Sequence, residues 1–299
     1  MDDRKNRAQV FVFVSGAPKR TNSVRAKAPL LQAYATLVYA FLYLPIVVLI
    51  VYSFNGGGVG GFPPRNWTLD WYRQLFGDAG LWDSVLNSLL VAVAAVGIAL
   101  GLGLPAALAL DRADFPGKSV FRRLVLLPLI VPGIITGLSL LMVFVAAGMK
   151  LSLLTITLGH GTALISVGTT EIFAGLQKLE RVQEEASLDL GANHWRTFWR
   201  VTLPNLKVPL IAAGLLIFTL SLDEIAVSFF LIGRSNTLPL EIWARLRQGM
   251  TPEINAISTL ILLFSFAAIV VSYRLRTRGA RTERIDADLL TATLEGEKA

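Results

Sequence analysis

Long uncharged stretches alternate with short charged ones along this chain, and they set the expected architecture. No Asp, Glu, Lys or Arg occurs in four blocks, 28–64, 84–110, 124–149 and 151–170. Each block reaches the roughly 20 residues that span a hydrocarbon core as a helix. Two further apolar stretches are 208–233, whose only charges are Asp223 and Glu224, and 256–273, which has none. The pattern predicts an all-α integral membrane protein with about six transmembrane helices.

Composition narrows the class further. Hydrophobic residues make up 54% of the 299 and charged residues 16%, whereas about a quarter of a typical soluble domain is charged. The chain has no cysteine, which excludes disulfides and thiolate metal sites, and no metal site is predicted. The stretch before the first span is long, polar and basic, unlike a cleaved signal peptide.

The basic residues are distributed unevenly between the two sides of a six-span arrangement. With both termini on one side, 22 of the 28 Lys and Arg lie on that side. The positive-inside rule then predicts cytoplasmic termini. The expected organisation is a cytoplasmic tail over 1–30, a transmembrane domain over 31–275 and a second cytoplasmic tail over 276–299. Because these charges flank spans, the net charge of +7 indicates a lipid bilayer as partner and no nucleic acid.

The polar stretch 177–207, between the fourth and fifth spans, holds the most informative pattern. We expect a helix over 180–190 that Gly191 ends, and a second short helix that Asn193 caps and Pro204 limits. On this second helix an aromatic face is formed by Trp195, Phe198 and Trp199. An uncovered aromatic face is a liability, so it is expected either in the groove of a partner protein or against lipid headgroups.

The same stretch resembles the EAA loop of ABC importer permeases: Glu-Ala-Ala, three residues, Gly, nine residues, Ile, one residue and Leu-Pro. The matching positions are Glu185, Ala186, Gly191, Leu203 and Pro204, with Ser187 for the second Ala and Val201 for Ile. In that family the loop is a coupling helix seated in a cleft of the ATPase subunit. The resemblance therefore implies that these residues, with Trp195, Phe198 and Trp199, couple the chain to an ATPase.

The resemblance covers roughly residues 37–269 and is strongest to the spermidine/putrescine permeases. The segments that carry it are 39–45, 218–224, 238–242 and 251–256. It implies a type I importer fold in the bacterial cytoplasmic (inner) membrane, with this chain as half of a hetero- or homodimeric pore. The implied partners are a second permease subunit, two ABC ATPases that bind ATP and Mg, and an extracytoplasmic solute-binding protein.

Two carboxylates in the predicted fifth span are candidates for the solute path. A carboxylate at the bilayer centre costs about 2.5–3.5 kcal/mol on insertion scales, so it needs a role or a wet surface. We expect Asp223 to face the path, Glu224 to cap or pair nearby, and Ser221 to hydrogen-bond in the same region. The alternative is a structural ion pair with a neighbouring helix.

One departure from the family bears on the solute. Where the spermidine/putrescine permeases have an acidic residue after a proline in the third span, this chain has Gly133 after Pro132. This departure counts against a di- or tricationic solute. The resemblance implies a polyamine such as spermidine or putrescine, and the alternative is another small amine, amino-acid-like or zwitterionic solute. A lone membrane histidine, His160, is expected to be a helix–helix hydrogen-bond partner rather than a proton relay.

The chain is not expected to be an enzyme or to bind nucleotide itself. Gly117, Lys118 and Ser119 match the end of a P-loop, but Arg112 stands where that motif requires its first glycine. An ion-coupled secondary transporter, using Asp223 or His160 for protons, is the alternative from another class. That alternative predicts inverted repeats, which the sequence lacks, and it leaves the EAA-like loop unexplained.

Overall fold

The computed structural model describes residues 28–57, 63–249, 251–264 and 266. Within these ranges the chain is helical, with one isolated bridge between Asn55 and Trp67. The named elements are α2 (Ala28–Tyr52), α3 (Asp70–Gly77), α4 (Ala79–Arg112), α5 (Lys118–Leu126), η1 (Leu127–Leu129), α6 (Gly133–Ala146), α7 (Leu153–Leu176), α8 (Val182–Asp189), α9 (His194–Thr197), η2 (Phe198–Thr202), α10 (Leu203–Asn205), α11 (Lys207–Leu222), α12 (Ala226–Leu231) and α13 (Leu238–Gln248). A further helix runs over Pro252–Phe264. The expected tails lie almost wholly outside the described residues.

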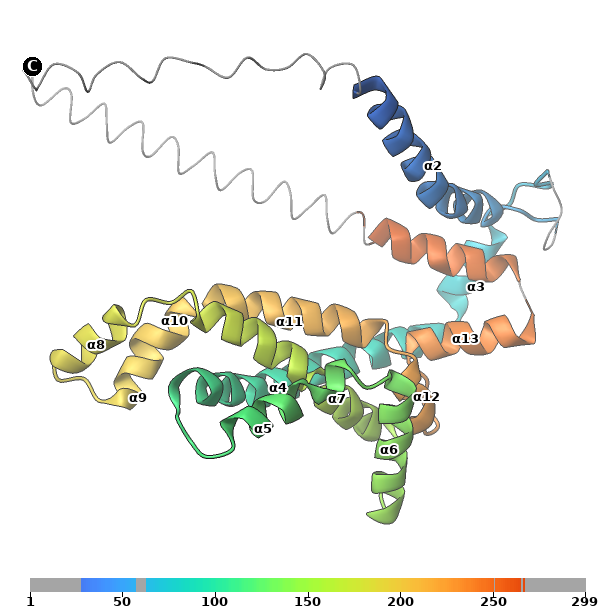
Figure 1. The fold of residues 1–299 in the computed structure, drawn as a ribbon. Coiled ribbons are helices and arrows are strands. Elements are labelled where there is room, and N and C mark those ends of the chain that lie inside the picture. Colours follow the sequence, from blue (N-terminus) through green and yellow to red (C-terminus); the bar gives the residue numbers. More distant parts are fainter. Residues whose placement is uncertain (1–27, 58–62, 250, 265, 267–299) are drawn as a thin grey trace, which may run out of the picture.

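Three long helices, α4, α7 and α11, form the centre of the molecule (Figure 1). The face of α4 toward its neighbours is lined with small residues, and Ala95, Ala99 and Ala107 are fully buried. Small side chains let helix backbones approach closely, which is the usual basis of helix packing in membranes. On the partner helices Ile172 and Ile217 are likewise fully buried against this face.

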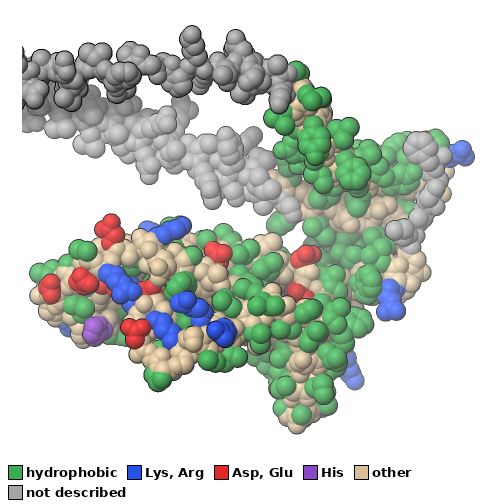
Figure 2. Space-filling model, in the orientation of Figure 1, with side chains coloured by type: hydrophobic (Ala, Val, Ile, Leu, Met, Phe, Trp, Pro, Cys, Tyr) green, Lys and Arg blue, Asp and Glu red, His purple; other side chains and the backbone are tan. Residues whose placement is uncertain are grey.

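Two of the described helices, α2 and α4, are long and apolar enough to cross a membrane, or up to four spans if each of two bent pairs counts as one. The 24-residue α7 and the shorter apolar helix Pro252–Phe264 occupy the fourth and sixth predicted spans. Figure 2 shows hydrophobic side chains over α2 and α6, and charged side chains gathered over the end of the molecule formed by α8 to α10. The polarity of the surface thus follows the predicted pattern.

The third predicted span is not one helix. The chain turns by 105° between η1 and α6, and the expectation of a single helix across 124–149 is wrong. The turn lies at Pro132, which has no backbone N–H to donate and which restrains the residue before it from helical geometry. Pro132 then stands immediately before α6, at its N-cap.

The fifth predicted span is also interrupted, and here the sequence interpretation needs its most consequential correction. Helix α11 ends at Leu222 and α12 begins at Ala226. Asp223 and Glu224 therefore lie in a non-helical turn between two helices, not within one continuous helix. Non-helical backbone and two carboxylates within the fifth apolar stretch fit a wet, protein-lined surface, the setting in which membrane proteins tolerate irregular backbone.

The opposite end of the molecule from α8 is held together by one arginine. Arg245 on α13 binds Glu241 on its own helix, Asp78 at the start of α4, and Glu253 on the last described helix. Burial by itself raises the pKa of Asp78, but hydrogen bonds from the Leu81 N–H and from Arg245 outweigh it and leave that pKa below its ordinary value. Three helices are thereby fixed relative to each other.

Candidate functional site

The 177–207 loop is an ordered pair of short helices. Helix α8 ends in a Schellman motif: the Gly191 N–H donates to the Leu188 carbonyl at 2.9 Å and the Ala192 N–H to the Ser187 carbonyl at 3.1 Å. Gly191 has φ +85°, a conformation that glycine adopts most readily. The predicted helix stop is confirmed, with the helix itself at Val182–Asp189.

The second helix of the loop begins as expected and continues further. The Asn193 side chain accepts a hydrogen bond from the Arg196 N–H at 2.8 Å and caps α9. Beyond Thr197 the chain passes through a π-helical turn into α10, and Pro204 stands in the first turn of α10. This helical run ends at Asn205, one residue beyond Pro204, and the chain then bends by 64° into α11, so Pro204 limits the helix as expected.

The three predicted aromatic side chains form one cluster on this helix. Ring centroids are 5.6 Å apart for Trp195 and Trp199, 5.4 Å for Phe198 and Trp199, and 6.2 Å for Trp195 and Phe198. Trp195 is 67% exposed and Trp199 51%, whereas Phe198 is half-buried. Nearby Leu190 is 89% exposed. This end of the described chain thus presents an uncovered apolar surface, defined by these four residues, which we call the aromatic face.

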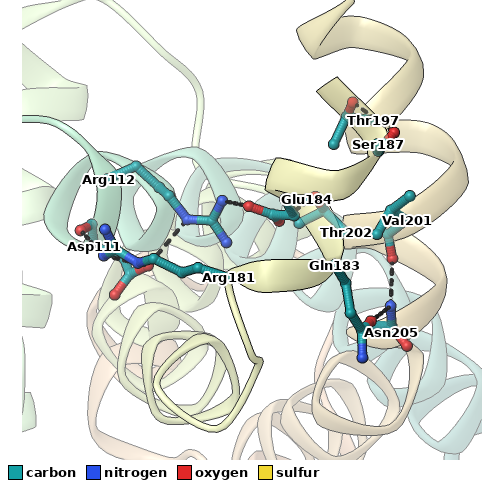
Figure 3. A network of polar contacts seen from close by, with 10 residues as sticks. All are labelled: Asp111, Arg112, Arg181, Gln183, Glu184, Ser187, Thr197, Val201, Thr202 and Asn205. Atoms are coloured by element: carbon teal, nitrogen blue, oxygen red, sulfur yellow. Dashed lines mark hydrogen bonds and ion pairs between the residues drawn. The ribbon is translucent and has the colours of Figure 1, made fainter. Parts of the chain in front are cut away.

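A buried carboxylate fixes the loop to the central bundle (Figure 3). Glu184 on α8 is 7% exposed. One of its oxygens pairs with the Arg112 guanidinium at the end of α4, and the other accepts a hydrogen bond from the Thr202 hydroxyl. Glu184 therefore joins both helices of the loop to α4.

Arg112 is itself held by a second carboxylate. Asp111, whose side chain is 4% exposed, accepts a hydrogen bond from Arg112 Nε at 3.1 Å and contacts Arg181 and Gln177 from the chain entering the loop. Two acids and two arginines thus balance in charge, as a partly buried ionic cluster requires. Figure 3 shows Arg112 reaching from Asp111 to Glu184. These contacts therefore tie the loop that carries the aromatic face to the end of α4.

The motif spacing selected Glu185 and missed Glu184. Glu185 and Ala186 are exposed, as are most residues of α8 that face away from the bundle. Among the matched positions, Leu203 is half-buried and Pro204 exposed. Ser187, the departure from the usual alanine, bonds the Thr197 hydroxyl at 3.1 Å and joins α8 to α9. The signal that was available for Glu184 is the pair of acids directly before Ala186, of which only one can face inward.

Neutralising these neighbouring acids is expected to separate their roles. In Glu184→Gln the Arg112 charge loses one partner, and the free energy of unfolding should fall by about 2 kcal/mol, less than for a fully buried pair because the Arg112 side chain is 28% exposed. Glu185→Gln, the matched control, should change it by less than about 0.5 kcal/mol. Thermal unfolding in detergent measures both; equal melting of Glu184→Gln and the unaltered protein would contradict the anchoring role.

The three predicted solute-path residues lie at the break between α11 and α12, and each has a different environment there. Asp223 is exposed, and Glu224 accepts a hydrogen bond from the Val227 N–H at 2.9 Å, which caps α12 as expected. Among the described residues neither carboxylate has an ion-pair partner. Ser221 is 4% exposed and bonds His160 on α7 at 2.8 Å, so it lies against a helix and away from the exposed acid. His160 is a helix–helix hydrogen-bond partner, as predicted.

Gly133 lies directly beside this break. A Cβ atom at position 133 would be 3.2 Å from the Cβ of Ala226 and 3.6 Å from Glu224 Oε1. An acidic side chain there would bring two carboxylates together, which raises the cost of ionising both. The chain thus has its acids on the α11–α12 turn and a glycine on the facing helix.

Known transport proteins are similar in sequence to this chain over most of its length. A family model described as "Binding-protein-dependent transport system inner membrane component" matches residues 99–281. The putrescine transport system permease protein PotI of Escherichia coli K12 is 38% identical over 76% of this chain and 83% of its own length. The spermidine/putrescine transport system permease protein PotC of Haemophilus influenzae is 34% identical over 81% of this chain and 94% of its own.

Solved structures agree on the fold. A chain of a bacterial ABC transporter involved in the import of the acidic polysaccharide alginate superimposes with a TM-score of 0.64 and 17% identity, covering 88% of this chain and 99% of its own. A chain of an amino acid ABC transporter gives a TM-score of 0.53 at 19% identity, over 70% and 99% of the two chains. At these identities the likeness is one of fold alone, and it is the fold of ABC transporter membrane subunits.

Proposed function

The chain belongs to the family of binding-protein-dependent transport system inner membrane components, and we propose that it forms half of the pathway of an ATP-driven polyamine importer. The observation that carries this proposal is the pairing of an exposed aromatic face with a rigid ionic link to α4. A stand-alone transporter has no use for such a surface. A subunit driven by a separate ATPase needs both the exposed aromatic face and its ionic link to α4.

The energy source is a pair of ABC ATPase subunits on which ATP and Mg bind. The helix that carries the aromatic face has a large apolar surface with an arginine beside it. A helix of this type docks into a groove of a partner protein. Glu185, Ala186 and Gly191 lie on the exposed side of the same loop, where an ATPase would meet them. Both termini and the loop are then cytoplasmic.

Two further partners complete the importer. A second permease subunit, identical or related, supplies the other half of the pore, and an extracytoplasmic binding protein delivers the solute, in keeping with a family of binding-protein-dependent systems. The end of the molecule held by Arg245 then faces the binding protein, since it lies opposite the loop (Figure 1).

The solute is a small polyamine, with putrescine favoured. Relatives that match most of the chain are named for putrescine or spermidine. Asp223 is exposed at the break between α11 and α12 and lacks an ion-pair partner within the described residues, so it is free to attract a cation. With Gly133 in place of an acid, the pathway has fewer negative charges, which favours a dication over a trication.

Uptake by cells that lack this chain tests the solute class. Restoring the chain, with its partners present, should restore uptake of radiolabelled putrescine, and unlabelled putrescine should compete more strongly than spermidine, a neutral amino acid or a zwitterionic amine. Competition by a zwitterion and none by either polyamine would reject the polyamine assignment while leaving the importer role in place.

A further inference from the structure

His160 connects the two sides of the helix break. Its ring nitrogens bond two serine hydroxyls, Nδ1 with Ser221 at 2.8 Å and Nε2 with Ser228 at 2.7 Å. Ser221 is in the last turn of α11 and Ser228 in α12, so the two lie on either side of the Asp223–Ile225 turn. All three side chains are at most 4% exposed. One buried side chain of α7 therefore holds both ends of the interruption.

The length of this bridge favours the broken helix over a continuous one. Residues seven apart in a continuous α-helix are separated by about 10.5 Å along its axis. The two hydrogen bonds and an imidazole of about 2.2 Å between its nitrogens keep the serine oxygens within about 8 Å of each other. The Cα–Cβ bonds of one helix lean the same way along its axis, so their tilt does not close that gap.

The helix that follows the break is seated tightly on α7. A Cβ atom at Gly159, next to His160, would be 2.3 Å from a methyl of Leu231 and 3.0 Å from one of Val227. The Thr155 hydroxyl donates to the Leu231 carbonyl at 2.9 Å. Since α12 is fixed in this way, the bond from His160 to Ser221 determines where α11 ends relative to it.

The consequence of the bridge is the placement of the acids. With the turn open, Glu224 caps α12 through the Val227 N–H and Asp223 is left exposed. Rewinding the turn into helix would carry Asp223 around the helix axis by about 100° per residue gained and would remove the cap. The geometry of recognition thus depends on a side chain that does not itself reach the surface.

We propose that His160 is a positioning residue for solute recognition, which holds the α11–α12 turn open so that Asp223 faces the translocation path. The inference rests on the proposed function in one respect, that Asp223 meets a cationic solute. His160 acts through its two hydrogen bonds, and because serine hydroxyls both donate and accept, either neutral tautomer satisfies them. No proton needs to be relayed.

The test measures uptake of putrescine by the complete importer in proteoliposomes supplied with ATP. In His160→Ala both bonds are lost, and the KM for putrescine should rise at least tenfold while the maximal rate per assembled complex changes less than threefold. His160→Asn, whose amide reproduces the position of Nδ1, should recover part of this loss. Ser228→Ala should raise the KM as well, and adding it to His160→Ala should have little further effect, since the bond is already gone.

Thr157→Val is the matched control. Its hydroxyl bonds the Leu153 carbonyl of its own helix and does not cross the break, so the KM should stay within twofold of the unaltered value. If His160→Ala prevents assembly, Ser228→Ala alone decides the matter, because it removes one hydroxyl and leaves the ring in place.

The inference is overturned if Ser228→Ala and His160→Ala leave the KM unchanged, or if they lower the maximal rate alone. It is also overturned if His160→Asn behaves as poorly as His160→Ala. When Asp223→Asn raises the KM and the His160 variants do not, only the positioning role fails. When the unaltered complex does not transport putrescine, the proposed function fails and the inference with it.

Discussion

Replacing Trp195 and Trp199 together with alanine is expected to reduce ATP-driven uptake at least 100-fold while the chain still inserts into the membrane. Each indole is more than half exposed in the chain on its own, so its apolar surface is available to be buried in a partner. Buried tryptophans are among the strongest contributors to interfaces, commonly about 2 kcal/mol or more each. Removal of both should lower the affinity for the ATPase about 1000-fold.

The ATPase that copurifies with the permease and the rate of solute uptake measure this effect. Trp67→Ala is the matched control, because Trp67 is 66% exposed but lies between α2 and α3, away from the loop (Figure 1). It should retain the ATPase and most of the uptake. Retention of the ATPase by the double variant would show that the aromatic face lies against lipid headgroups instead.

Asp223→Asn has the second largest expected effect, on affinity for a cationic solute. The change keeps the size of the side chain and removes its charge. Hydrogen bonds to a charged group contribute about 1.5–3 kcal/mol, so the KM for putrescine should rise about 10- to 150-fold. The maximal rate should change far less, because the 177–207 loop is untouched.

Two further variants separate recognition from structure at the break. Glu224→Gln keeps an oxygen that can accept from the Val227 N–H, so its KM should change less than that of Asp223→Asn. Asp114→Asn removes a carboxylate that is 98% exposed and distant in sequence from Asp223. Its KM for putrescine should equal that of the unaltered protein. An unchanged KM in Asp223→Asn would make that carboxylate structural and reject the proposed path.

Much of the fold follows from the sequence for simple physical reasons. Charge-free blocks locate α2, α4 and α7, because a hydrocarbon core tolerates few charges. The helix boundaries in the 177–207 loop are also predictable from the sequence, since Gly191 and Asn193 are strong local signals for ending and starting helices. Both residues do what their types predict.

The interruptions were less predictable. A proline in a membrane helix is compatible with a kink or a full turn, and only the packing around Pro132 decides between them. Nothing local marks Leu222 as a helix end. The break there depends on His160, which lies 61 residues before Ser221 and meets it only in the folded bundle.

In the candidate site, too, local sequence predicts some features, and contacts between distant parts of the chain determine the others. Motif spacing selected Glu185, which is exposed, whereas the buried contact to α4 is made by its neighbour Glu184. Spacing within a motif indicates which residues a family shares, but it does not indicate which of two adjacent acids turns inward. That depends on Arg112, 72 residues earlier in the chain.

We propose that ATP drives solute through this chain by way of the 177–207 loop. The most direct test is ATP-dependent putrescine uptake by the reconstituted importer, with the unaltered chain and with a deletion of 185–191. We predict uptake that requires ATP and is abolished by the deletion, with the altered chain still present in the membrane. Uptake that persists after the deletion, or that a proton gradient drives without ATP, would show that the loop does not drive transport.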